Sequence, residues 1–169
     1  MRQVLLAWTV ATDPVATQNV YREIRVGAAA TCGCAPCRNF DTARPALYPR
    51  TLSELLDAAA IDPCKETKVK LVAPLEHGLQ LYAGTYLFCG EILAGRAFRG
   101  FPFLKDEVDV FERIGDTAHV ALRPWLCPEA PWAPRPCVRL EFLVVLPWVL
   151  EGAGAGAVNL GDRSRCLMS

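Results

Sequence analysis

Histidine is scarce in this chain of 169 residues, and neither His77 nor His119 lies next to a candidate nucleophile in the sequence. The sequence also contains no G-x-S-x-G nucleophile motif and no phosphate-binding loop. The candidate acid–base pairs are Glu76 with His77 and Asp116 with His119. Proximity in sequence alone is weak support for catalysis by either pair. These absences weigh against the common hydrolases and phosphate-transferring enzymes.

A net charge is also missing, because 18 Lys and Arg residues balance 18 Asp and Glu residues. Without a long basic run we expect no nucleic acid as a partner. No apolar run reaches the about 20 residues that a transmembrane helix needs, so we expect no membrane association. The apolar run Val4 to Val10 is short for a signal peptide and has no convincing cleavage site before Asp13. We therefore expect a cytoplasmic protein.

Hydrophobic residues make up 52% of the chain, which is enough for a substantial core. The length suggests one domain, which we place at residues 1–150, followed by a flexible C-terminal tail at residues 151–169. The tail contains Gly152 to Ala157, which matches the G-x-G-x-x-A dinucleotide fingerprint. However, the chain ends too soon to form the helix and strand that this fingerprint requires.

The hydrophobic patterns predict an α+β fold, with a mostly antiparallel β-sheet and one or two helices inserted after the second strand. Thr51 to Glu54 has the pattern of a capping box and predicts a helix with a buried stripe formed by Leu52, Leu55, Leu56 and Ala59. A short helix is expected at Phe40 to Ala46. Gly84 and Gly90 indicate a bulge or a close backbone contact within a long strand. The expected strands are Val4 to Thr9, Val20 to Val26, Thr67 to Val72, Leu79 to Leu93, Glu107 to Arg113, Thr117 to Leu122 and Val138 to Leu146, with a hairpin around Gly115.

Three of the eight cysteines lie within six residues, in Cys32-Gly33-Cys34-Ala35-Pro36-Cys37. A tight loop of this kind can supply two or three thiolates to one zinc ion, so Cys32, Cys34 and Cys37 are candidate metal ligands. The usual second C-x2-C pair of a zinc ribbon is absent. The candidates for a fourth ligand are Cys64, Cys89, Cys127, Cys137, His77 and His119.

Two other interpretations of the cysteines remain open. Cys34 and Cys37 have the C-x-x-C spacing of thiol–disulfide enzymes, although no βαβ pattern surrounds them. The even number of cysteines also allows disulfides, or the thiols can simply be buried. Cys64, Cys89 and Cys137 are expected to be inert core residues. Cys166 is expected to be an exposed thiol in the tail.

Residues 123–136 contain five prolines together with Trp125 and Trp132, and we expect an extended loop. Such a loop can offer a polyproline surface to a partner, but more often its tryptophans cover a sheet edge or the core.

Several motifs together resemble a family of small uncharacterised bacterial proteins. They are Cys32-x-Cys34-x2-Cys37-Arg38-Asn39-Phe40, Ile61-Asp62-Pro63-x-Lys65-Glu66, the glycine- and aromatic-rich segment from Gly78 to Gly90, Leu140-Glu141-Phe142 and Leu146-Pro147-Trp148-Val149-Leu150. The likeness covers the chain up to about residue 150. It implies a shared fold and a bacterial cytoplasmic setting, but no known activity.

The sequence favours a non-enzymatic bacterial protein that binds a protein partner of unknown identity. Its cysteine loop would be fixed by a structural Zn2+ or by local packing, and Asn39 would hydrogen-bond the backbone of that loop. The alternative is a thiol–disulfide or metal-handling protein, in which Cys34 attacks and Cys37 or Cys32 resolves the intermediate.

Overall fold

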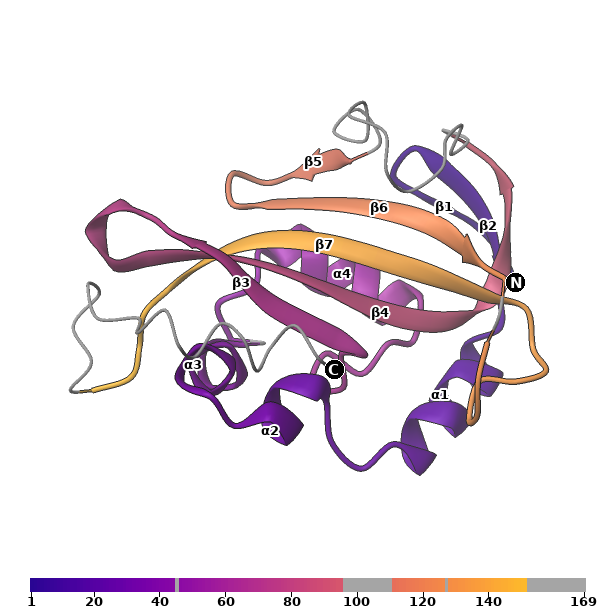
Figure 1. The fold of residues 1–169 in the computed structure, drawn as a ribbon. Helices are drawn as coiled ribbons and strands as arrows, with labels where there is room; N and C mark the ends of the chain where they lie inside the picture. Colours follow the sequence, from indigo (N-terminus) through magenta and orange to yellow (C-terminus); the bar gives the residue numbers. More distant parts are fainter. Residues whose placement is uncertain (45, 96–110, 127, 152–169) are drawn as a thin grey trace.

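A computed structural model describes residues 1–44, 46–95, 111–126 and 128–151 of the chain (Figure 1). The described part has an α+β fold, which confirms the predicted class. The expected tail falls outside the described residues except for Glu151. The elements are β1 (Arg2–Leu5), β2 (Trp8–Thr12), α1 (Pro14–Glu23), α2 (Ala28–Cys32), α3 (Ala35–Ala43), α4 (Arg50–Ala58), β3 (Lys68–Pro74), the 3-10 turn η1 (Glu76–Gly78), β4 (Leu79–Ala94), β5 (Glu112–Ile114), β6 (Ala118–Trp125) and β7 (Cys137–Pro147).

All pairings between the described strands are antiparallel, in the order β1-β2-β4-β7-β6-β5, and β3 also pairs with β4. Strand β4 is central because its first half pairs with β3, its end pairs with β2, and most of its length pairs with β7. The two glycines of β4 confirm the predicted close contacts. A Cβ at Gly84 would lie 2.3 Å from the Phe142 ring, and one at Gly90 would lie 2.4 Å from the Ala11 carbonyl oxygen.

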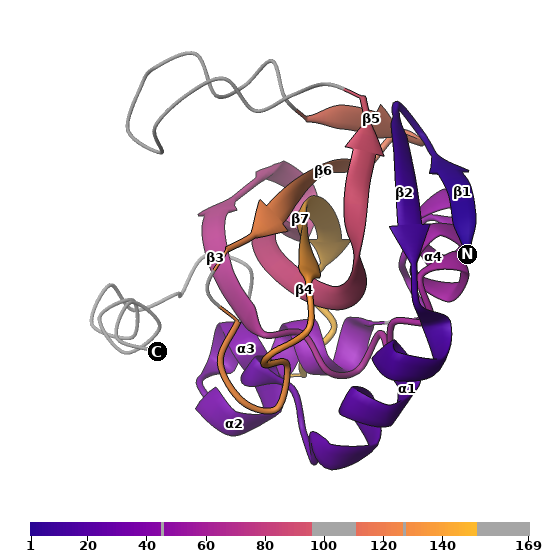
Figure 2. The same cartoon turned by 90° about the vertical axis from the view of Figure 1, so that its right-hand side faces the viewer.

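Helices α1, α2 and α3 lie on one side of the strands in both views (Figures 1 and 2). The alternate residues of β4 that face the core include Tyr82 and Tyr86, and Phe142 faces it from β7. Phe40 of α3 packs on the face formed by these two paired strands, with ring centroids 5.2 Å from Tyr82 and 6.0 Å from Phe142. This aromatic cluster fixes α3 against the sheet.

The N-terminal segment differs from the prediction. The expected strand Val4 to Thr9 is a hairpin of β1 and β2, which turns at Leu6 with a positive φ of 55°. The expected strand Val20 to Val26 is wrong, because this segment contains the end of helix α1. Asp13 caps this helix by accepting a hydrogen bond from Ala16 N at 2.9 Å. Its buried residues, Thr17, Val20 and Tyr21, have the spacing of one helical face.

The described part of the chain has four α-helices after β2 rather than one or two. The predicted helix at Phe40 to Ala46 begins earlier, at Ala35, and ends at Ala43. The capping box is also wrong: α4 begins at Arg50 after Pro49, and Glu54 pairs with Arg50 at 2.7 Å. The predicted buried stripe of α4 is confirmed for Leu52, Leu55, Leu56 and Ala59.

The β-rich half follows the prediction closely where it is described. The long strand β4, the final strand β7 and the hairpin of β5 and β6 are present, although part of the expected segment Glu107 to Arg113 lies outside the described residues. In the proline-rich segment, Trp132 is buried and packs edge-to-face on Tyr21 of α1 at 5.2 Å. This tryptophan therefore covers the core rather than presenting a surface to a partner.

Candidate metal centre

The three clustered cysteines lie at the junction of α2 and α3. Cys32 is the last residue of α2, and Gly33 reverses the chain in the left-handed conformation with φ 65°. Cys34 is the N-cap residue of α3, and Cys37 lies in the first turn of that helix. Pro36 lies in the first turn of α3, where proline is favoured because the backbone N–H that it lacks would have no partner within the helix. The predicted loop is thus a tight corner between two helices.

The corner brings the thiol groups together. The Sγ atoms of Cys32, Cys34 and Cys37 all lie within 4.8 Å of one another. Cys37 is buried, whereas Cys32 and Cys34 are half-buried. Three thiolates at this separation can hold a thiophilic metal ion.

No other Cys, His, Asp or Glu side chain from the described ranges joins this cluster. Cys64, expected to be a core residue, is exposed, and His77 is exposed beside Glu76. Cys89 and Cys137 are buried in the sheet, as expected from the sequence, and His119 lies on β6. Cys127 and Cys166 fall outside the described residues. Three of the predicted ligands are therefore brought together, and the other described candidates are not.

A cavity of about 440 Å³ opens beside the cluster and is lined by both Cys32 and Cys37. Its other walls include Lys68 and Lys70 of β3 and the ring of Phe142. A water molecule, a small ligand or a side chain from another molecule can therefore approach two of the three cysteines.

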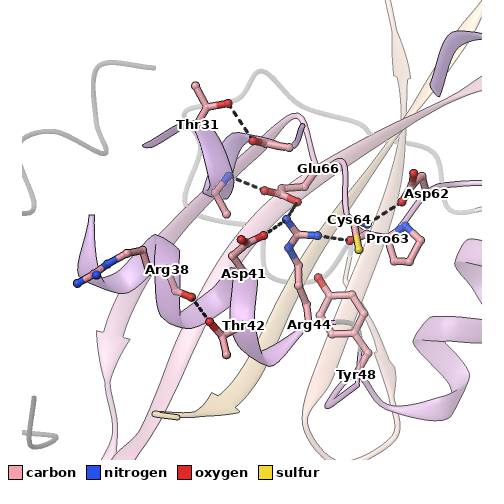
Figure 3. Close-up of polar contacts among 12 residues, drawn as sticks. Thr31, Arg38, Asp41, Thr42, Arg44, Tyr48, Asp62, Pro63, Cys64 and Glu66 are labelled. Atoms are coloured by element: carbon pink, nitrogen blue, oxygen red, sulfur yellow. Dashed lines mark hydrogen bonds and ion pairs between the residues drawn. The ribbon is translucent and has the colours of Figure 1, made fainter. Parts of the chain in front are cut away.

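A buried ion pair fixes the two helices to the sheet (Figure 3). Glu66, just before β3, accepts a hydrogen bond from Ala29 N of α2 at 2.6 Å and lies 3.0 Å from Arg44 Nη2 at the end of α3. Arg44 also pairs with Asp41 at 2.7 Å and donates to Pro63 O at 2.9 Å. Burial raises the pKa of Glu66, and the Ala29 N–H and the Arg44 guanidinium oppose that shift. Glu66 thus connects both helices of the cysteine corner, α2 and α3, to the segment that begins β3.

Gly27 permits this arrangement at the start of α2. A Cβ at this position would lie 2.6 Å from Glu66 Oε2 and 2.7 Å from Cys64 O. Any larger residue would separate α2 from the segment that carries Glu66.

Asn39 does not bond the backbone of the cysteine corner, so that expectation is wrong. Its fully buried amide donates to Tyr82 OH at 3.0 Å and to Pro147 O at 3.1 Å. Its Oδ1 accepts from Val149 N at 2.7 Å. Asn39 therefore connects α3 to the end of β7. These hydrogen bonds join residues that are more than 100 positions apart, so no local sequence pattern indicates them.

Arg44 and Glu66 are the residues near the centre whose role could not be predicted from the sequence. The only local signal was the spacing of Asp41 and Arg44, because an acid and a base three residues apart share one face of a helix. The contact with Glu66 depends on the tertiary fold.

Comparisons with known proteins give no family for this chain. No protein-family model matches, and neither does any curated protein or solved structure. Within residues 1–44, 46–95, 111–126 and 128–151, none of the helices has the length and hydrophobicity needed to cross a membrane.

Proposed function

We propose that this chain is a non-enzymatic bacterial binding protein in which Cys32, Cys34 and Cys37 hold a structural Zn2+. The observation that carries the proposal is the convergence of three Sγ atoms within 4.8 Å at one helix corner. Two thiolates bound to one tetrahedral zinc ion at about 2.3 Å lie about 3.8 Å apart. Small side-chain rotations therefore suffice to bring the three sulfur atoms onto one ion.

The surroundings of the corner favour a structural role for the ion. Helix α2 has only five residues, so it gains little stability from its own hydrogen bonds. An ion bound by both α2 and α3 would fix their relative orientation, adding to the effect of Glu66. The cavity lined by Cys32 and Cys37 would leave the fourth position open to water or to a side chain of the partner protein.

Zinc titration tests this proposal with the wild-type chain and two single variants. We expect Cys37→Ser to lose most of its zinc affinity and Cys64→Ser, which changes an exposed thiol outside the cluster, to bind zinc like the wild type. The partner is sought by affinity purification from bacterial lysate with zinc-loaded and zinc-free protein. Equal zinc binding by all three proteins would contradict the metal site. A zinc-loaded protein that remains monomeric without any partner would count against the binding role.

A second candidate function is thiol–disulfide exchange or metal handling at the same residues. The observation that favours it is the position of Cys34 at the N-cap of α3, one helical turn before Cys37, so that the C-x-x-C pair lies at the start of a helix as in thiol–disulfide enzymes. This candidate predicts that Cys34 reacts rapidly with iodoacetamide in the native, metal-free protein. Alkylation of Cys34 no faster than that of the exposed Cys64 would argue against it.

A further inference from the structure

A second pair of cysteines lies outside the corner, in the second half of β4 and at the start of β7. Cys89 of β4 and Cys137 of β7 occupy directly opposite positions in the antiparallel register. Their neighbours form a hydrogen-bonded pair, because Gly90 N donates to Pro136 O at 2.9 Å. Hydrogen-bonded and non-hydrogen-bonded pairs alternate along an antiparallel ladder, so Cys89 and Cys137 form a non-hydrogen-bonded pair.

The other backbone contacts of Cys89 agree with this assignment. Its N–H donates to Thr17 Oγ1 at 3.0 Å, and its carbonyl oxygen accepts from Asp13 N at 2.9 Å. Both groups therefore point towards α1 and not towards β7. In a non-hydrogen-bonded pair the Cα atoms are about 4.5 Å apart, which lies within the range of about 4.4–6.8 Å that a disulfide needs.

The two thiols differ in their surroundings. Cys89 lines a cavity of about 310 Å³ that is also lined by Arg135, Asp13 and Glu91, whereas Cys137 does not line it. The neighbouring Cys137 side chain, whose Sγ donates to Arg135 O at 3.4 Å, lowers the pKa of Cys89, and Thr17 and Arg135 act in the same direction against the effect of burial. The contact with Cys89 raises the pKa of Cys137. Of the two buried thiols, Cys89 is thus the one that borders a cavity and the one whose pKa is lowered.

We propose that Cys89 and Cys137 form an internal dithiol that a low-molecular-weight disulfide of the glutathione class converts into a cross-strand disulfide. The Cys89 thiolate attacks one sulfur of the small disulfide, forms a mixed disulfide and releases one thiolate, which takes up a proton. Cys137 then loses its proton and attacks Cys89 Sγ, which releases the second small thiol. Two protein thiols are oxidised and one small disulfide is reduced to two thiols. This site is separate from the proposed metal centre.

Incubation of the full native chain with oxidised glutathione tests this proposal. The protein is then denatured, its remaining thiols are alkylated, and its peptides are identified by mass spectrometry. We expect a linked peptide pair that contains Cys89 and Cys137 and has lost two hydrogens, with two glutathione molecules released per disulfide. The exposed Cys64 is the internal control, because its glutathionylation shows that the oxidant was active.

A Cys137→Ser variant tests the order of the two steps. Without the resolving thiol, we expect the mixed disulfide with glutathione to accumulate on Cys89. Cys64→Ser is the matched control and should form the disulfide between Cys89 and Cys137 as the wild type does. The wild-type result decides the proposal even if Cys137→Ser does not fold. Recovery of both Cys89 and Cys137 as alkylated thiols, while Cys64 carries glutathione, would overturn it.

Discussion

Replacement of Arg44 by Met removes the cation that faces the buried Glu66 carboxylate while keeping an unbranched, apolar side chain at this buried position. The side chains of Arg44 and Glu66 are only 1% and 0% exposed. Removing one partner of a buried ion pair costs about 3–5 kcal/mol, because the other charge stays buried without compensation. In a domain of this size 1 kcal/mol changes Tm by about 2–4 °C, so we expect Arg44→Met to lower Tm by about 6–20 °C.

The pH dependence of this loss gives a second test. Burial already raises the pKa of Glu66 above its ordinary value of 4.5, and Arg44 opposes that shift, so Arg44→Met raises this pKa further. When the pKa of a carboxyl group is higher in the folded than in the unfolded state, its contribution to the folding free energy is fully present at a pH below its unfolded pKa. That contribution is lost as the pH rises through its folded pKa. The difference in unfolding free energy between the variant and the wild type should therefore be smaller at about pH 5 than at about pH 8.

Arg50→Met is the matched control for both measurements. Arg50 Nε lies 2.7 Å from Glu54 Oε1, but these side chains are 91% and 57% exposed. Such a surface pair contributes about 0.5 kcal/mol or less, so its loss should change Tm by about 2 °C at most. Thermal and urea unfolding followed by circular dichroism measure the effect of both variants. Equal stability of Arg44→Met and Arg50→Met, or a loss independent of pH, would refute the role assigned to the buried pair.

Two further substitutions test the framework around the centre. Asn39→Leu removes the hydrogen bonds to Pro147 O, to Val149 N and to Tyr82 OH, although Tyr82 still donates to Pro36 O, and we expect about 3 kcal/mol of destabilisation in urea unfolding. A loss below about 1 kcal/mol would contradict this role. Gly84→Ala places a Cβ 2.3 Å from the Phe142 ring and 2.7 Å from Lys68 O, and should cost about 1–3 kcal/mol in the same assay. Wild-type stability of Gly84→Ala would show that the sheet adapts at this contact.

The β-rich half of the fold could be predicted because its strands carry strong local signals. The long apolar and aromatic run in β4 and the turn at Gly115 needed no tertiary information. The N-terminal half was harder. Val20 to Val26 has a mixed apolar pattern that suits a strand, and the stronger signal was Asp13-Pro14, which caps α1 and supplies its first residue.

Only the part of the candidate site that depends on the spacing of residues close in sequence could be predicted. The spacing of Cys32, Cys34 and Cys37 sufficed to propose one cluster, and the structure brings their sulfur atoms together. The bond between Arg44 and Glu66 and the register that pairs Cys89 with Cys137 join segments that are distant in sequence. Sequence patterns determine which residues share one element, but not which elements meet.

The proposed zinc site is tested most directly by the metal content of the wild-type chain purified without a chelator, measured by elemental analysis together with the reactivity of each native cysteine. We expect one zinc ion per chain, with Cys32, Cys34 and Cys37 protected from alkylation until the metal is removed. A chain that contains no metal after exposure to zinc, and whose three cysteines react equally with and without a chelator, would contradict the proposed centre.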